Sequence, residues 1–370
     1  MEEHGHARQS AKESLVADDL AAFKQRFDPV LGAVLRRHLA EMCATTEDPH
    51  LDEYLEYLTE TFAVHGKRIR PFVLSAIYES ITGHCPSAVL EYSVGVELFH
   101  TFCLIHDDII DNSTIRHRLP TFHVEIARRM AEGGRVGDVA EIGRAQAMLV
   151  GDLLFFWAHQ RLQLADGFTE EQRKAASVVV RQMVEDVVVG QMVDVDAMSR
   201  QRVSKSLVER KTMLKTAGYT FIHPMQLGVA LAGGSESLMC WCAQFGEALG
   251  EAFQVMDDLL DIVGDPAKGA QARLSDIREH QHTFFTQYVF DHGTPQQGRK
   301  LNSWLGSPIA EPEIPTVAAL FEETGALTAG RSRIISRLED AKQCLKAVPD
   351  GAVASRKLSG LIDLLAARLV

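Results

Sequence analysis

The segment "LIHDDIID", residues 104–111, places three aspartates within five positions of a mostly apolar stretch. Apolar residues recur around it at three- and four-residue spacing, which predicts a helix. In a helix, Asp107 and Asp111 lie one turn apart on the same face, where their carboxylates repel each other. Burying such charges without partners costs still more free energy. The stretch therefore predicts a helix that brings carboxylates to a cation.

A second segment, "VMDDLLDIVGD" at residues 255–265, repeats the pattern. A solvated acidic surface is the ordinary explanation for one such run. Two matched clusters, each flanked by leucine and isoleucine, make that explanation less favourable. Mg²⁺ binds carboxylate oxygens together with water and substrate phosphate oxygens. Two acidic faces opposed across a cavity therefore predict a metal cluster that grips a diphosphate.

The rest of the chain also has helical periodicity, for example over residues 20–43 and 88–111. Strand-like alternation is nearly absent, and glycine and proline cluster at the breaks between helical segments. The proline-rich segment 306–316 is linker-like but is followed by more helix. We therefore expect a disordered tail over residues 1–15 and one all-α domain, a helical bundle, over residues 16–370.

Composition excludes some classes of protein. The formal net charge of −12 and the pI near 5.7 argue against a nucleic-acid partner. The six cysteines lack zinc-site spacing, which indicates reduced thiols in a cytoplasmic protein. We expect no transmembrane segment, because no apolar run approaches the roughly 18–20 residues that span a bilayer. The polar start of the chain also lacks the apolar block of a signal peptide.

The two acidic clusters resemble the paired DDxxD motifs of the trans-isoprenyl diphosphate synthase (polyprenyl synthetase) family. Further motifs follow in the family's order: "GKRIRP" (66–71), "GDLLFFWA" (151–158), "GQMVD" (190–194), "KTAGYTFIHPMQLG" (215–228) and "FQVMDD" (253–258). The resemblance covers nearly the whole chain from about residue 20. It implies a bundle of the isoprenoid synthase type with a central active-site cavity, and a homodimer.

The resemblance implies a prenyltransferase that condenses an allylic diphosphate with isopentenyl diphosphate by Mg²⁺-assisted ionisation. Charge develops on the departing diphosphate, so fixed cations stabilise the transition state. Mg²⁺ would bind Asp107, Asp111 and Asp257. The supporting carboxylates would be those of Asp108, Asp258 and Asp261. The departing diphosphate would then take the proton that the new chain loses.

The resemblance also implies roles for residues that hold the isoprenoid diphosphates. Lys67, Arg70 and His100 would bind isopentenyl diphosphate. The residues implied at the allylic diphosphate or the reacting carbons are Arg116, Asp194, Lys215, Thr216, Phe253 and Gln254.

An aromatic residue limits product length in the family when it forms the floor of the chain-binding tunnel. Phe102 lies five residues before Asp107, about one turn deeper along the same helix face, and the next residue, Cys103, is small. This combination resembles short-chain synthases that stop at geranylgeranyl or farnesyl diphosphate. A core aromatic with no such role is an equally good reading of Phe102.

The chain departs from the family pattern at two places. At residues 116–118 it reads "RHR", so His117 replaces an arginine that would hold isopentenyl diphosphate. A histidine is only partly protonated near neutral pH and lacks the planar fork of arginine. After the second cluster, Gln271 and Gln281 stand where lysines would be, with Lys268 and Arg273 close enough in sequence to substitute. These changes weaken the phosphate grip and leave the metal-binding carboxylates in place.

Two alternatives remain open. A terpene synthase-like lyase would ionise the same substrate without a second diphosphate, which His117 favours and the retained Lys67, Arg70 and His100 disfavour. A non-catalytic subunit that regulates a sister synthase would not need six costly aspartates.

Overall fold

The computed structural model describes residues 2–46, 49–63, 65–116, 118–264, 273–349 and 356–369. The described chain is almost entirely helical, and its strands are one short antiparallel pair. The all-α prediction is therefore confirmed. The contacts divide the chain into two compact units, one of Asp18–Ser177 and one of Met1–Ala17 with Val178–Val370.

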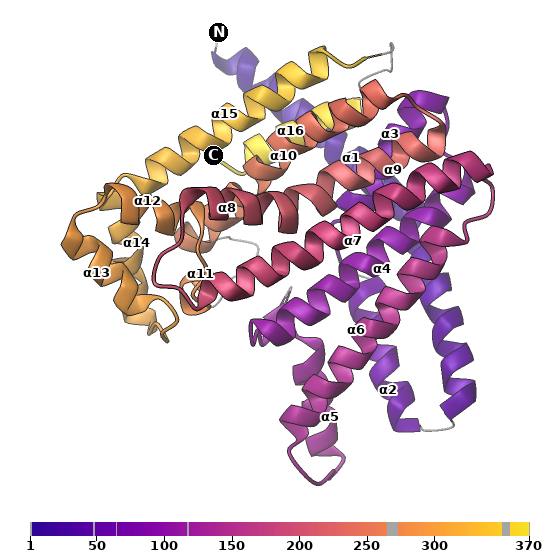
Figure 1. The fold of residues 1–370 in the computed structure, drawn as a ribbon, viewed down its shortest axis with the longest axis horizontal. Coiled ribbons are helices and arrows are strands. Elements are labelled where there is room, and N and C mark those ends of the chain that lie inside the picture. Colours follow the sequence, from indigo (N-terminus) through magenta and orange to yellow (C-terminus); the bar gives the residue numbers. More distant parts are fainter. Residues whose placement is uncertain are drawn as a thin grey trace. The chain divides into compact units, whose positions relative to one another are not determined.

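The unit of Asp18–Ser177 is built around α4, which packs against α3, α5 and α6 (Figure 1). A two-stranded hairpin follows α4 and pairs Ile115 with Pro120 and Arg116 with Leu119. The elements of this unit are α1 (Glu2–Thr46, which also enters the other unit), α2 (Pro49–Leu58), η1 (Thr59–Ala63), α3 (Ile69–Thr82), α4 (Ser87–Ile110), β1 (Ile115–Arg116), β2 (Leu119–Pro120), α5 (Phe122–Glu132) and α6 (Val139–Gln163).

The second unit is built around α10, which packs against α15, α9 and the π-helical segment η2. The helix α7 begins in the first unit and continues into this one. The elements of the second unit are α7 (Glu170–Met198), α8 (Lys205–Thr212), η2 (Met213–Ile222), α9 (His223–Ala232), α10 (Glu236–Val263), α11 (Ser275–Arg278), α12 (Phe284–His292), α13 (Pro295–Trp304), η4 (Glu311–Glu313), α14 (Ile314–Glu323), α15 (Ala326–Lys346) and α16 (Arg356–Ala367).

Two glycines allow η2 to pack closely between its neighbours. A Cβ at Gly190 of α7 would lie 2.8 Å from the backbone nitrogen of Lys215. A Cβ at Gly250 of α10 would lie 2.4 Å from the Cβ of Ala217. Neither distance is compatible with a side chain, so both helices reach the backbone of η2 only because glycine stands there. This packing fixes the position of Lys215.

The helix α4 is apolar enough to pass a simple test for a membrane span. An 18-residue window within it has a mean hydropathy of 1.4, and 72% of that window is buried inside the protein. The expectation that no run reaches this length does not hold for α4. Its burial is that of a core helix, which passes the same test of length and composition.

The backbone is described as helical from Glu2 as part of α1, and the disordered tail over residues 1–15 stays a prediction. The prediction of one domain over residues 16–370 stays a prediction, since the contacts form two units.

Candidate active site

The first acidic cluster lies at the carboxyl end of α4. Asp107 and Asp108 belong to its last turn and Asp111 is its C-cap. The carboxyl end of a helix carries the negative end of its dipole, which disfavours carboxylates. This cost adds to the repulsion between Asp107 and Asp111, both of which are only partly buried. A bound cation would relieve both costs.

Asp108 is in a different environment from its neighbours. It is 2% exposed, and Arg116 of the hairpin donates to both of its carboxylate oxygens, with Nε at 2.9 and 3.0 Å and Nη2 at 2.6 Å. The structure thus brings Arg116 to the first cluster, where it neutralises Asp108. Direct metal binding by Asp108 would require this ion pair to open.

Arg68 fixes the basic motif at residues 66–71, although the family resemblance implies roles only for its neighbours Lys67 and Arg70. Arg68 is buried, has a left-handed φ of 56°, and donates at 2.8 Å to both Asp28 and Glu97. This anchor leaves Lys67 exposed and Arg70 partly exposed. Both retain the surface access that binding a diphosphate requires.

His100 and Phe102 both lie on α4 and are partly exposed. The ring of Phe102 packs against Phe155 of α6, with centroids 5.2 Å apart, and against His106 at 4.7 Å. His106 in turn contacts the Met148 carbonyl oxygen at 3.1 Å. These contacts assign His106 a structural place between α4 and α6, and they fix the orientation of Phe102.

The second acidic cluster lies near the carboxyl end of α10, so it meets the same unfavourable helix dipole. Asp257 is partly exposed, and its Oδ1 lies 3.5 Å from Nη2 of Arg368. Asp261 accepts from the backbone nitrogen and hydroxyl of Ser275, at 3.0 and 2.6 Å, and from the backbone nitrogen of Asp276 at 3.2 Å. Asp261 therefore caps the amino-terminal end of α11 and joins this helix to α10.

Asp258 is 6% exposed and ends a chain of three polar side chains. Thr216 donates to Gln254 at 2.6 Å, and Gln254 donates to Asp258 at 2.7 Å. Burial raises the pKa of Asp258 to about 7, with Asp257 and Asp261 adding to the shift. The structure thus joins the predicted residues Thr216 and Gln254 to the second cluster. Phe253 lies beside them and packs edge-on against Phe221, with ring centroids 5.6 Å apart.

Lys215 shares a buried carboxylate with a second lysine. Asp194 of α7 is 2% exposed and accepts from Lys215 at 2.7 Å and from Lys211 at 2.8 Å. Burial acts to raise the pKa of Asp194, but the two ammonium groups outweigh it and lower the pKa. Lys211 also donates to Gln281 at 3.2 Å.

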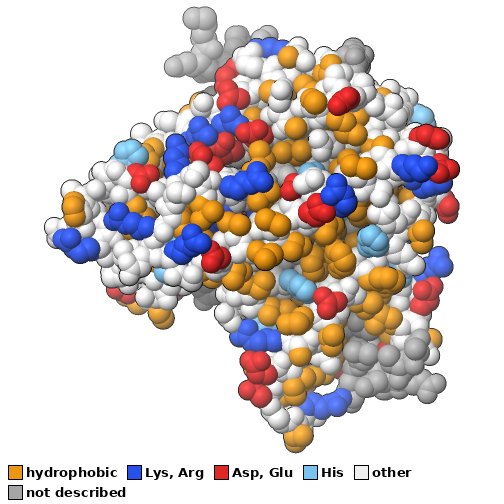
Figure 2. All heavy atoms as spheres, viewed as in Figure 1, with side chains coloured by type: hydrophobic (Ala, Val, Ile, Leu, Met, Phe, Trp, Pro, Cys, Tyr) orange, Lys and Arg blue, Asp and Glu red, His pale blue; other side chains and the backbone are white. Residues whose placement is uncertain are grey.

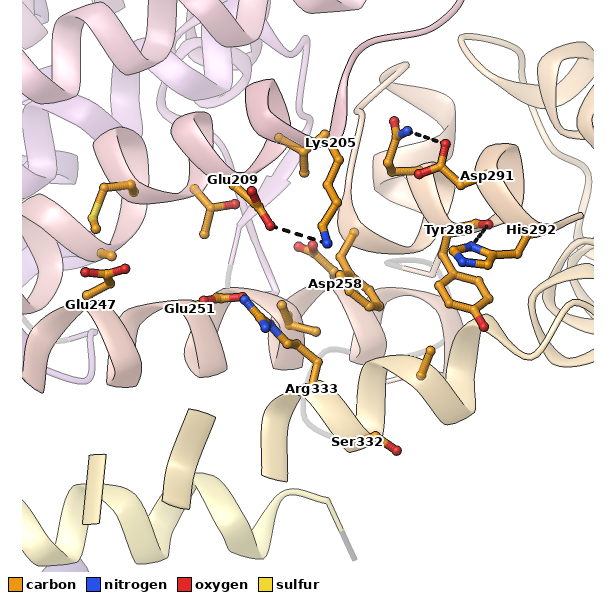
Figure 3. Close-up of a pocket in the computed structure, with 18 residues that line it drawn as sticks. Lys205, Glu209, Glu247, Glu251, Asp258, Tyr288, Asp291, His292, Ser332 and Arg333 are labelled. Atoms are coloured by element: carbon orange, nitrogen blue, oxygen red, sulfur yellow. Dashed lines mark hydrogen bonds and ion pairs between the residues drawn. The ribbon is translucent and has the colours of Figure 1, made fainter. Parts of the chain in front are cut away.

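A cavity of about 750 Å³ lies between α8, α10, α12 and α15 (Figure 3). The carboxylate of Asp258 is at its wall, whereas Asp257 and Asp261 do not line it. Arg333 points toward Glu251 and pairs with it at 2.5 Å. The cavity therefore contacts the second cluster through its buried member alone.

The carboxylates fit Mg²⁺ by their chemistry. Among the described residues, no three His, Cys, Asp or Glu side chains form a group able to hold a metal ion by themselves. An incomplete protein shell suits Mg²⁺, which keeps several waters and binds substrate phosphates through one or two carboxylates. Asp107, Asp111, Asp257 and Asp261 are the partly exposed members of the two clusters, and Asp261 already accepts hydrogen bonds from Ser275 and Asp276.

The remaining residues that the sequence singled out differ in what can be said of them. His117, Gln271 and Lys268 lie outside the described residues. Arg273, expected as a substitute cation, instead donates to the Ile262 carbonyl oxygen at 2.8 Å. Lys211 has no role among the residues that the resemblance implies. Its position four residues before Lys215 was the signal in the sequence, because like charges at this spacing repel each other unless a carboxylate balances them.

A family model described as polyprenyl synthetase matches residues 48–322. The chain belongs to the polyprenyl synthetase family. A geranylgeranyl diphosphate synthase of Methanosarcina mazei is 28% identical over 314 residues, which cover 84% of this chain and 87% of that protein. A geranylgeranyl diphosphate synthase of Saccharolobus solfataricus is 31% identical over 256 residues, covering 68% and 71%.

Solved structures agree with this assignment. The geranylgeranyl pyrophosphate synthase of Corynebacterium glutamicum, complexed with isoprenyl diphosphate and magnesium, aligns with a TM-score of 0.84 and 28% identity, covering 92% of this chain and 98% of that one. This polyprenyl synthetase therefore has the all-α isoprenoid synthase fold and is an enzyme, a prenyltransferase. The predictions of family, fold class and enzyme class are confirmed.

Proposed function

We propose that this polyprenyl synthetase condenses an allylic diphosphate with isopentenyl diphosphate and releases a short-chain trans-prenyl diphosphate, geranylgeranyl or farnesyl diphosphate. The observation that carries the proposal is the pair of acidic clusters, each at the carboxyl end of a long apolar helix. The names of the relatives and the magnesium and isoprenyl diphosphate in the Corynebacterium complex support it.

Asp107, Asp111 and Asp257 are the residues that would hold Mg²⁺. When bound, Mg²⁺ supplies positive charge that stabilises the departing diphosphate. Lys215 would bind the same diphosphate. Asp194 fixes its ammonium, and the next residue, Thr216, is joined through Gln254 to Asp258 of the second cluster. Thr216 and Gln254 would lie beside the reacting carbons, oriented by their hydrogen bonds to each other and to Asp258.

Lys67, Arg70 and His100 would bind isopentenyl diphosphate. The buried Arg68 supports this role. Its ion pairs with Asp28 and Glu97 fix the backbone between Lys67 and Arg70. A rigid loop loses less conformational entropy when it binds a diphosphate.

Phe102 would limit the length of the product. Its contacts with Phe155 and His106 hold the ring in one position, which a tunnel floor requires. Cys103 beside it is buried.

We also propose that the enzyme is a cytoplasmic homodimer with no transmembrane segment and no nucleic-acid partner. The helix α7 exposes Val188, Val189, Met192 and Val195 at helical spacing, and hydrophobic side chains gather along it in Figure 2. Such an exposed apolar face is typical of a surface that meets another protein. A second copy of this chain is the partner we expect, because most soluble oligomers are symmetric homo-oligomers.

Incubation with Mg²⁺, isopentenyl diphosphate and dimethylallyl, geranyl or farnesyl diphosphate tests the proposal. We expect an elongated diphosphate that disappears when a chelator removes Mg²⁺. A hydrocarbon or an alcohol would instead identify a lyase, and the absence of either product would favour a regulatory subunit. The variant Lys67→Met separates the transferase from the lyase. In a transferase it should raise the KM for isopentenyl diphosphate and leave the ionisation of the allylic diphosphate unchanged.

A further inference from the structure

A second ammonium lies over the carboxylate that Lys215 already neutralises. Lys211 Nζ is 2.8 Å from one oxygen of Asp194, and Lys215 Nζ is 2.7 Å from the other. The side chain of Lys211 is 13% exposed, so this charge is largely removed from water. Two cations on one anion leave a surplus positive charge at the junction of α8, η2 and α7.

The next partner of Lys211 is uncharged. Its Nζ lies 3.2 Å from the amide oxygen of Gln281, a buried residue in the loop between α11 and α12. By resemblance to the family, a lysine would stand at position 281. A lysine there would bring a second ammonium to Lys211, and like charges at such a distance repel strongly. The chain therefore has its cation on α8 and a neutral acceptor in the loop.

We propose that Lys211 binds the diphosphate of the allylic substrate and supplies the positive charge that position 281 lacks. The proposal rests on the proposed function only for the identity of the substrate. An ammonium has three N–H donors. In the described part of the chain, Lys211 gives two of them to Asp194 and Gln281, which leaves one for a phosphate oxygen.

A purely structural role would be met by a neutral side chain. Lys215 alone balances the charge of Asp194, and a glutamine amide could donate to Asp194 as Lys211 does. Holding a lysine here instead costs side-chain entropy and desolvation. The competing explanation is that Lys211 offsets the carboxylates of Asp258 and Asp276, on both of which its charge acts.

An exchange of the two side chains tests the proposal. Binding of inorganic diphosphate in the presence of Mg²⁺ is measured by titration calorimetry for the wild type, Lys211→Gln and the double variant Lys211→Gln with Gln281→Lys. We expect Lys211→Gln to weaken binding by about 10-fold or more, as for the loss of a charged hydrogen bond. The double variant should recover to within about threefold of the wild type, because it returns the cation to the same contact.

Lys205→Gln is the matched control, since Lys205 lies on the same helix and its side chain is mostly exposed. It should bind diphosphate as the wild type does. Wild-type affinity in Lys211→Gln overturns the proposal. A folded double variant that binds diphosphate about 10-fold more weakly than the wild type also overturns the proposal. This second comparison can be made even if Lys211→Gln alone does not fold.

These results are independent of chain elongation, because inorganic diphosphate needs no isopentenyl diphosphate to bind. If the wild type elongates no substrate but the exchange pattern holds, the proposed function fails and the role of Lys211 stands. If the wild type elongates an allylic diphosphate but the exchange pattern is absent, only the inference about Lys211 fails.

Discussion

Neighbouring aspartates in the first cluster differ in what they contact. Asp108 is buried and has both oxygens paired with Arg116, whereas Asp107 is partly exposed. Both oxygens of Asp108 already accept from Arg116, so this carboxylate fixes the position of the hairpin that carries Arg116. A partly exposed carboxylate at the negative end of a helix is better placed to bind a cation. The same residue type thus serves structure at one position and chemistry at the next.

Asp107→Asn is expected to lower kcat by about 100-fold or more, because a neutral amide binds Mg²⁺ poorly and the loss falls on the transition state. Its free energy of unfolding should not fall and should rise by up to about 1 kcal/mol, because the amide removes a charge from the negative end of the helix dipole and from the neighbourhood of Asp111. Steady-state kinetics and urea unfolding measure the two quantities. Unchanged kcat would remove Asp107 from the metal site.

Phe102→Ala is expected to shift the product to a longer chain, since it removes the ring that Phe155 and His106 hold in place. Chromatography of the dephosphorylated products measures the shift. Phe156→Ala is the control, because Phe156 follows Phe155 on α6 but is largely exposed. The same product from wild type and Phe102→Ala would place the tunnel floor elsewhere.

At the scale of elements, the contact of α7 with α8 and η2 depends on the buried ion pairs of Asp194. The ammonium groups lower the pKa of Asp194, so its ionised form stabilises the fold at any pH above its unfolded pKa of about 3.9. This contribution is lost as the pH falls below that value toward the lower pKa of the folded state.

Asp194→Asn is therefore expected to lower the free energy of unfolding by about 3 kcal/mol at pH 7, because it leaves two ammonium groups without their counter-ion. The difference from the wild type should be the same at pH 5 and smaller at pH 3. Urea unfolding at the three pH values measures it. Asp196→Asn, whose partner Arg200 is exposed, should show little change at any of them. A difference for Asp194→Asn that grows on acidification would contradict the account.

Helical periodicity was enough to predict most of the helices, because each buries one apolar face. It could not predict η2. The π-helical segment at residues 213–222 has the same apolar spacing as an α-helix, and its geometry depends on the close approach of Gly190 and Gly250 from two other helices. Such an approach is a tertiary contact that local sequence does not specify.

The same limit applies to the anchors of the site. The acidic clusters could be identified because their residue types recur at helical spacing, and Lys215 because its motif resembles that of the family. Arg68 could not be assigned its role, because Asp28 and Glu97 lie 40 and 29 residues away in the sequence. Nothing in a single sequence indicates which carboxylates a buried arginine will reach.

At the scale of the whole molecule, the exposed apolar face of α7 is the surface through which we expect two copies to associate. Met192→Glu is expected to convert a dimer into monomers, because it places a charge in an apolar contact and repeats it in both copies. Sedimentation velocity measures the change. Ile335→Glu on α15 is the matched control, since Ile335 and Met192 are 60% and 66% exposed. A dimer that survives Met192→Glu would place the interface on another face.

The central claim is that both acidic clusters are needed to hold one assembly of metal ions and diphosphate. The most direct test counts Mn²⁺ ions bound in place of Mg²⁺, by electron paramagnetic resonance, in the presence of a thiolo analogue of an allylic diphosphate that does not ionise. The wild type should bind Mn²⁺ only together with the analogue. Both Asp107→Asn with Asp111→Asn and, separately, Asp257→Asn should lose bound ions and weaken the binding of the analogue. If removal of either cluster leaves the number of ions and the affinity unchanged, the two clusters do not share a ligand and the account is wrong.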